Sequence, residues 1–120
     1  MAVNIKFLNE NATSVSEQAI SEINFGNVIR GNSSEVGFKI GNTGDSIAES
    51  VTIKIEGSSQ AVSWKQLSKD NGSSWTSEIA IDDIPALTGL SGKIKIKTTV
   101  PSSASTGAYN SVVRVEYIYI

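Results

Sequence analysis

The sequence predicts an all-β protein, built as an antiparallel β-sandwich, and three observations lead to that fold class. Apolar and polar residues alternate in several short runs, which is the period of a strand with one buried face. Clusters of Gly, Asn, Asp and Ser separate these runs, as turn residues do. The chain shows no internal repeat and no heptad pattern, which excludes solenoids and coiled coils.

Five runs carry the alternation most clearly. Their inward-facing sets are Val3, Ile5 and Phe7; Val36, Phe38 and Ile40; Val51, Ile53 and Ile55; Ile94 and Ile96; and Val113, Val115, Tyr117 and Tyr119. Turn clusters lie at residues 30–33, 41–44, 56–59 and 101–103. This spacing predicts about seven to nine strands in a sandwich of the immunoglobulin type, although the Cys and Trp hallmark of antibody domains is missing.

The chain has 120 residues, a length that fits one hydrophobic core. We expect a single domain over residues 1–120, with an N-terminal strand and loop in residues 1–21 and the main sandwich in residues 22–120. Residues 11–23 could form either a helical turn or a loop, because their apolar spacing suits a helix while their Ser and Asn content favours a loop.

One hairpin can be placed in register from the sequence. The pair Asn71-Gly72 is a strong signal for a two-residue turn. That turn sets Ser68 opposite Trp75, and it predicts two apolar pairs further out. These pairs are Trp64 with Ile79 and Val62 with Ile81.

Charge and hydropathy argue against several classes of partner. The formal net charge is −2, so no broad positive field is available to gather nucleic acid. No apolar run approaches the roughly 20 residues that a transmembrane helix needs, and the N-terminus lacks the basic start and apolar core of a signal peptide. We therefore expect no nucleic acid, no membrane and no export signal.

The residue types available for catalysis are few. The chain has no His and no Cys, which excludes a Ser-His-Asp triad, a Cys-His pair and nearly every zinc or copper site. A Ser-Lys dyad is formally available, but no pair is marked out. We expect no enzyme, no catalytic residue, no cofactor and no metal.

Three charged groups have both a functional and a structural interpretation. Asp82 and Asp83 could act as paired carboxylates, but adjacent strand residues face opposite ways, so a turn role is favoured. Asp45 and these two residues could hold calcium, although no Asp-x-Asp-x-Asp spacing is present. Lys93, Lys95 and Lys97 could track phosphates, but their alternation with isoleucines predicts the solvent-facing side of a strand, where lysines also discourage edge pairing.

Trp64 and Trp75 could be platforms on which a sugar stacks. The hairpin register places Trp64 toward the core and Trp75 near the turn. Packing is the favoured role for both, because a sugar site needs a polar cluster beside the ring.

The C-terminal strand is the least conventional feature. Its inward set ends with Tyr117 and Tyr119, while its outward set changes from charged residues to Ile118 and Ile120. Either another part of the domain or a neighbouring chain covers this second apolar face. Tyr117, Ile118, Tyr119 and Ile120 are therefore the candidate interface.

The hairpin turn carries a recognisable motif. The stretch SKDNGSSW over residues 68–75 resembles the Asp-box of sialidases and other β proteins, with Ser74 in place of Thr. The resemblance implies a structural hairpin role for Ser68, Asp70, Gly72 and Trp75, remote from catalysis. It occurs once, and so implies no sialidase.

A wider resemblance covers residues of about 22 to 117 and rests on three motifs: FGNVIRG, NTG and VPSSASTGAY. The matching positions are Phe25, Gly26, Val28 and Gly31; Asn42, Thr43 and Gly44; Val100, Pro101, Ala104, Gly107 and Tyr109. The chain is similar here to immunoglobulin-like modules of secreted glycosidases, of adhesins and of the capsids and tails of tailed bacteriophages.

The phage setting is the leading interpretation, because a module with its own Met1 and no export signal resembles a virion component assembled in the host cytoplasm. We expect a non-enzymatic capsid decoration or tail protein that docks onto other virion proteins or onto itself. The alternative is a carbohydrate-binding or adhesin module from a larger secreted protein.

Overall fold

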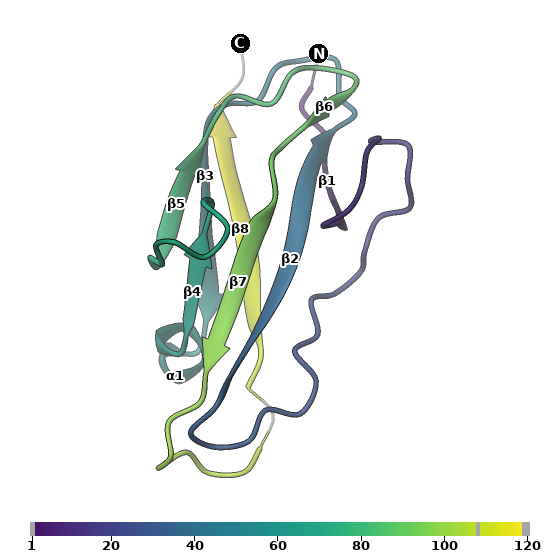
Figure 1. Cartoon of the computed structure of the whole chain (residues 1–120). Helices are drawn as coiled ribbons and strands as arrows, with labels where there is room; N and C mark the ends of the chain where they lie inside the picture. Colours follow the sequence, from purple (N-terminus) through teal and green to yellow (C-terminus); the bar gives the residue numbers. More distant parts are fainter. Residues whose placement is uncertain (1, 108, 119–120) are drawn as a thin grey trace.

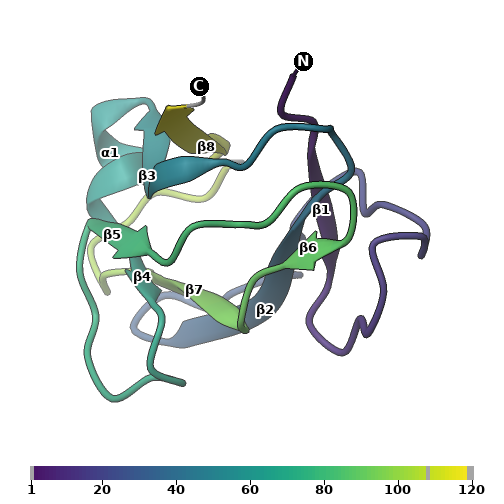
Figure 2. The ribbon, with the colours of Figure 1, turned by 90° about the horizontal axis from the view of Figure 1, so that it is seen from above.

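The computed structural model of the chain describes residues 2–107 and 109–118. These residues form two antiparallel sheets packed face to face, as Figures 1 and 2 show from two directions. The predicted antiparallel β-sandwich is confirmed, and its arrangement is compatible with the immunoglobulin-like architecture. The described residues contain eight strands, within the expected number.

The larger sheet has the strand order β1-β2-β7-β4, and the short β6 pairs with the end of β2. Its strands are β1 (Ile5–Asn9), β2 (Ser33–Asn42), β4 (Lys65–Ser68), β6 (Gly89–Leu90) and β7 (Ile94–Thr99). The smaller sheet has the order β5-β3-β8. Its strands are β3 (Glu49–Gly57), β5 (Glu78–Ile81) and β8 (Ser111–Ile118), and a five-residue helix α1 (Ser59–Ser63) follows β3.

The core lies between the sheets and is filled by every second residue of the strands, as the alternation predicts. The larger sheet contributes Phe38, Ile40, Leu67, Ile94 and Ile96, and the smaller sheet contributes Val51, Ile53, Ile55 and Ile79. The ring of Phe7 lies 5.9 Å from that of Phe38, so β1 extends this packing to the edge of the larger sheet.

The predicted turn of the hairpin forms, but its outer pairs are wrong. Asn71 and Gly72 have φ of 60° and 92°, as a two-residue type I′ turn requires. A bridge between Leu67 and Thr76 keeps the predicted register. Beyond it the arms separate: β4 pairs with β7 in the larger sheet, and β5 pairs with β3 in the smaller one.

Two local causes explain the separation. In the predicted register Leu67 and Ile79 would lie on opposite faces of one ribbon, whereas in separate sheets both face the core. In addition, the Ser58 side chain accepts a hydrogen bond from the Ala61 amide and caps α1, so Val62 is helical and Trp64 ends the helix. The predicted partners of Val62 and Trp64 therefore pair elsewhere, Ile81 with Val51 and Ile79 with Ile53.

A second apolar cluster lies on the outer face of the larger sheet. Leu8 is fully buried there and packs with Ala12 and Val15, which are 1% and 8% exposed. A methyl group on Gly41 would lie 2.9 Å from a Val15 methyl group and 3.1 Å from a Leu8 methyl group, so the segment lies directly against β2. Residues 11–23 contain no helix, and the loop interpretation is the correct one.

Asn42 explains in physical terms why an Asn opens the NTG motif. Its side chain is fully buried and uses all of its hydrogen-bonding capacity. Oδ1 accepts from the amides of Asn4 and Gly44 at 3.2 and 3.0 Å, and Nδ2 donates to the carbonyls of Ser46 and Ile84 at 2.8 and 3.3 Å. One side chain thus joins the N-terminal strand to two loops at the same end of the sandwich.

Candidate functional site

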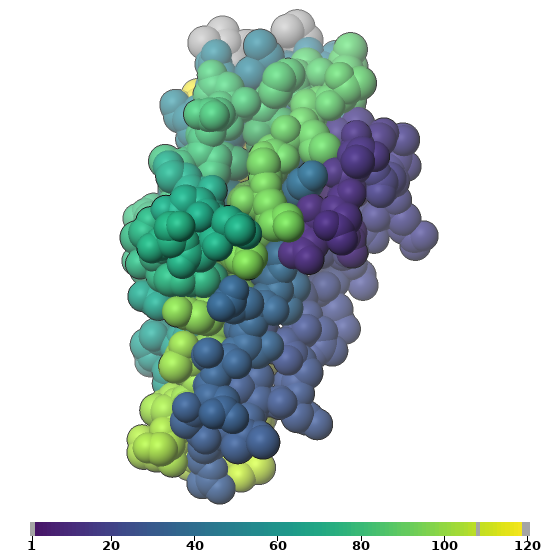
Figure 3. Space-filling view, in the orientation of Figure 1, coloured from purple at the N-terminus to yellow at the C-terminus, as the bar shows by residue number. Residues whose placement is uncertain are grey.

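A cleft opens on the side of the sandwich along which residues 21–28 run, within the connection between β1 and β2 of the larger sheet. The Ile20 amide bonds to the Phe7 carbonyl, and the Gly31 amide bonds to the Val100 carbonyl. Between these anchors, residues 21–28 form no backbone-to-backbone hydrogen bond with the described chain. Figure 3 shows the N-terminal third of the chain, in purple to blue, forming one side of the molecule.

Beneath this segment lie two adjoining cavities of about 410 and 690 Å³. They are called the cleft from here on. Six residues line both cavities: Glu22, Ile23, Phe25, Lys65, Tyr109 and Asn110. The smaller cavity is also lined by core-side residues of both sheets, including Phe7, Ile96 and Val113, so the cleft reaches into the apolar interior.

Lys65 is the most unusual residue of the cleft. It occupies the first position of β4, shares the inward face with Leu67, and is only 7% exposed. Its Nζ donates to the Ala61 carbonyl at 3.2 Å. Removal from water lowers the pKa of the Lys65 ammonium, because burial disfavours the charged form.

An aromatic pair lies beside this lysine. The rings of Trp64 and Tyr109 are 4.5 Å apart and tilted by 56°, which is a favourable arrangement of aromatic quadrupoles. The Tyr109 hydroxyl donates to the Ser105 carbonyl at 2.8 Å. Both rings line the larger cavity, so the cleft combines an amphipathic aromatic wall with a buried cation.

Lys65 is a site residue without a recognised motif, and the strand pairs that predict a core position for Trp64 do not form, because Trp64 ends α1. The signal was present in the short run KQLS, because Leu67 is the apolar residue of that run and Lys65 shares its face. Tyr109 was named only as a motif position. Sequence alone could not show that it meets Trp64 across 45 residues of chain.

The predicted interface residues occupy different environments. Tyr117 packs against the core cluster, as do Val113 and Val115. Ile118 lies on the other face of β8 and is 59% exposed, so the described part of the domain leaves most of this side chain uncovered. Tyr119 and Ile120 lie outside the described residues.

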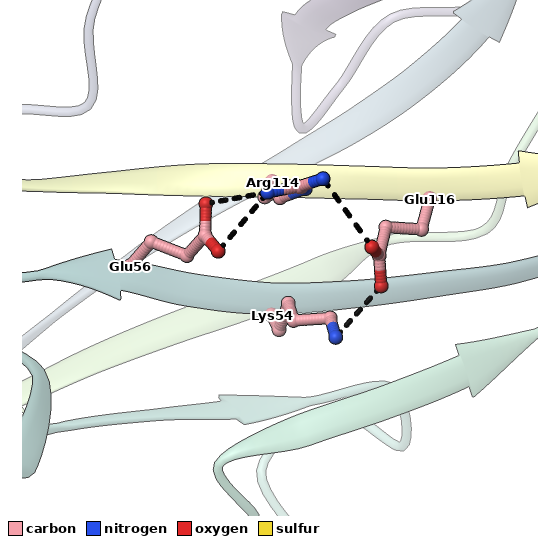
Figure 4. A network of polar contacts seen from close by, with 4 residues as sticks. All are labelled: Lys54, Glu56, Arg114 and Glu116. Atoms are coloured by element: carbon pink, nitrogen blue, oxygen red, sulfur yellow. Dashed lines mark hydrogen bonds and ion pairs between the residues drawn. The ribbon is translucent and has the colours of Figure 1, made fainter.

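The outer face of β3 and β8 is charged up to Glu116. Lys54 pairs with Glu116 at 2.7 Å, and Arg114 lies between Glu56 at 3.2 Å and Glu116 at 3.5 Å (Figure 4). The hydrogen bond and charge of Glu116 raise the pKa of Lys54, while those of Lys54 lower the pKa of Glu116. Ile118 is therefore an apolar residue that follows a group of mutually paired charges along the outer face of β8.

The Asp-box-like turn is held by a network around Asp70. This carboxylate accepts hydrogen bonds from the Ser74 hydroxyl and amide and from the Ser68 hydroxyl. Ser68 in turn accepts from the Gly72 amide at 2.9 Å. These bonds, led by the Ser74 hydroxyl, lower the pKa of Asp70 to about 2. Each bond links residues of the same turn, which is the geometry of a structural element.

Trp75 lies beside β7, the strand that pairs with β4. It is half-buried, and the Lys97 ammonium lies 4.4 Å from the centre of its ring. Lys95 pairs with Glu35 at 3.6 Å, and Lys93 is exposed. The lysines do line the solvent side of a strand, but their proposed role in edge protection is wrong, because β7 lies between β2 and β4.

The acidic loop residues serve the backbone. Asp82 and Asp83 follow the end of β5, as the turn interpretation predicts, and Asp83 accepts from the Ser50 amide at 3.2 Å. Asp45 accepts from the Ala2 amide at 2.7 Å. In residues 2–107 and 109–118, no three acidic side chains gather as a metal site would require.

The single helix found in these ranges has neither the length nor the apolar character to cross a bilayer. Comparisons of the chain with protein-family models, with curated proteins and with solved structures find no match.

Proposed function

We propose that the chain is a non-enzymatic structural or accessory protein of a phage or prophage virion, either a capsid decoration or a tail component. It acts by docking onto a neighbouring coat or tail protein in the assembled particle. The motif resemblance over residues of about 22 to 117 supports the setting, and the sandwich fold agrees with it. The observation that carries the docking is Ile118, an apolar residue left 59% exposed on an edge strand.

The docking surface is the apolar end of the sandwich, defined by Ile47, Leu87 and Ile118. These side chains are 49%, 62% and 59% exposed. They belong to one end of the molecule, because the Leu87 amide bonds to the Gly44 carbonyl and Ile118 pairs with Glu49. Figure 1 shows that the loops after β2 and β5 and the end of β8 meet there.

The chemistry of this end favours an apolar partner surface. On the outer face of β3 and β8, the charges of Lys54, Glu56, Arg114 and Glu116 pair with one another. Among the described residues, β8 lies at the edge of the smaller sheet, and an edge strand is where a partner chain can align with a sheet. Together, the apolar end and this edge provide apolar burial and orientation.

The test compares particles assembled with three forms of the protein. Wild-type protein is expected to cosediment with the particles, Ile118→Lys to be lost from them, and Ile29→Lys to be retained. Ile29 is the matched control because it is 72% exposed and lies near the opposite end, where its carbonyl accepts from the Asn32 amide.

Retention of Ile118→Lys, or absence of the wild type from particles, would refute the docking surface. A dimer of the isolated protein that Ile118→Lys dissociates would instead identify a second copy as the partner.

A carbohydrate-binding or adhesin module is the alternative function. Trp75 keeps part of its ring accessible, but Lys97 already lies over the ring, which leaves less of it for a sugar. Binding on a glycan array that Trp75→Ala abolishes would favour this alternative over the virion role.

A further inference from the structure

Lys65 is a buried cation without an acidic partner. It is 7% exposed, and no carboxylate of residues 2–107 or 109–118 lies within ion-pair distance of it. An ammonium group has three donors, and the Ala61 carbonyl accepts one of them. Burying a charge is costly unless it is paired and hydrogen-bonded. The Lys65 ammonium therefore lacks the negatively charged partner that a buried cation normally has.

The space beside Lys65 suits a small organic molecule. Ligand pockets usually measure about 300–1,000 Å³ and combine apolar walls with a few polar groups, and the smaller cavity has a volume of about 410 Å³. Its walls include Phe7, Ile23, Phe25 and Val113, and Asn110 supplies an amide. These walls can take an apolar body, while Asn110 and Lys65 can bind a polar head.

We propose that the cleft binds a small organic monocarboxylate, with the carboxylate at Lys65 and an aliphatic or aromatic body against the apolar walls. The charge of the walls favours a single negative charge on the ligand. Glu22 lines both cavities and would repel a second negative charge, and the whole chain already has a formal net charge of −2. This site is separate from the apolar end of the sandwich and does not depend on the docking function.

A purely structural role for Lys65 makes the opposite prediction. If the lysine served only to cap the Ala61 carbonyl, Lys65→Met would lower the melting temperature and no carboxylate would bind. If the lysine is kept for a ligand, Lys65→Met removes an unpaired buried charge while it keeps the apolar stem, so the melting temperature stays the same or rises. Ligand binding is lost in that variant.

The experiment titrates isotope-labelled protein with three probes that share one body and differ in the head group: 4-phenylbutyrate, 4-phenylbutanol and 4-phenylbutylamine. Amide shifts of Ile23, Phe25 and Asn110 report binding in the cleft. We expect the carboxylate to bind at least tenfold more tightly than the alcohol, and the amine to bind least. Lys65→Met should remove the tenfold preference for the carboxylate.

Lys97→Met is the matched control, because Lys97 carries the same charge on the outer face of the larger sheet; it should keep the preference. Equal binding of acid and amine to the wild type would overturn the proposal, and so would carboxylate binding that Lys65→Met leaves unchanged or the absence of any binding. If Lys65→Met fails to fold, the comparison of acid and amine on the wild type decides alone.

Discussion

At the scale of single residues, several positions are fixed by how closely two pieces of backbone approach each other. At Gly89 an added Cβ would lie 2.0 Å from the Pro85 carbonyl oxygen and 2.7 Å from the Pro85 nitrogen. Backbone atoms cannot move aside as the end of a flexible side chain can. Gly89 is thus required by the way the loop after β5 returns to pair with Asn42.

The first prediction concerns this glycine. Gly89→Ala should lower the free energy of unfolding by about 1–3 kcal/mol, the usual cost of overpacking, as measured by urea denaturation. Gly92→Ala is the matched control three residues away, because its Cβ would meet nothing within 4 Å and its φ lies outside the left-handed region. That variant should stay within about 0.5 kcal/mol of the wild type. Equal effects of the two variants would contradict the close approach.

The second prediction concerns Asp70 and pH. The folded-state pKa of about 2 lies below the value of about 3.9 of an unfolded aspartate. The stability that its hydrogen bonds provide is therefore present above pH 4 and is lost as the pH falls toward 2. Asp70→Asn cannot titrate, so between pH 4 and pH 2 its urea midpoint should fall less than that of the wild type. Asp82→Asn controls for the loss of one carboxylate, and it should follow the wild-type curve; parallel curves for all three proteins would be the contrary result.

At the scale of elements, the strands with strict alternation could be predicted from sequence, but the way they divide between the sheets could not. Residues Val36, Phe38 and Ile40 indicate β2, because a period of two has one meaning in a half-buried strand. The predicted strand pairs of the hairpin are wrong beyond its turn. The register of two neighbouring strands does not show whether a strand elsewhere in the chain is a better partner for either of them. β7 offers Ile96 to Leu67, and β3 offers Ile53 to Ile79, and these long-range pairs outweigh the local ones.

The candidate site was less predictable than the strands for the same reason. The cleft brings together Phe25, Lys65 and Tyr109, which come from a segment without strand pairing, the start of β4 and the approach to β8. No local pattern relates these three residues. In contrast, the Asp70 network joins residues within a single turn, so the hydrogen bond from a turn amide to Asp70 could be predicted from the motif.

At the scale of the whole molecule, the strands of the sheets and the segment that covers the cleft are attached by different kinds of contact. Every strand interior to a sheet is bonded on both sides, whereas the side of the molecule at the cleft is covered by residues 21–28, which lack backbone-to-backbone bonds with the described chain. Apolar contacts from Ile23 and Phe25 hold this segment against the core. The sandwich is therefore a cooperative body with one weakly attached side.

The last prediction follows from that unequal attachment. Amides without hydrogen-bonded structure exchange by small local openings, while those of central strands exchange only when most of the fold opens. Hydrogen exchange measured by nuclear magnetic resonance should therefore show residues 21–28 as the least protected internal segment, and β2, β3 and β7 as the most protected strands.

Residues 12–15 are an internal control, since they also lie outside the strands but bury Ala12 and Val15; they should exchange more slowly than residues 21–28. Protection of residues 21–28 equal to that of β1 would mean that the segment belongs to the cooperative fold. Rapid exchange would instead show that the cooperative fold does not protect the amides of this segment.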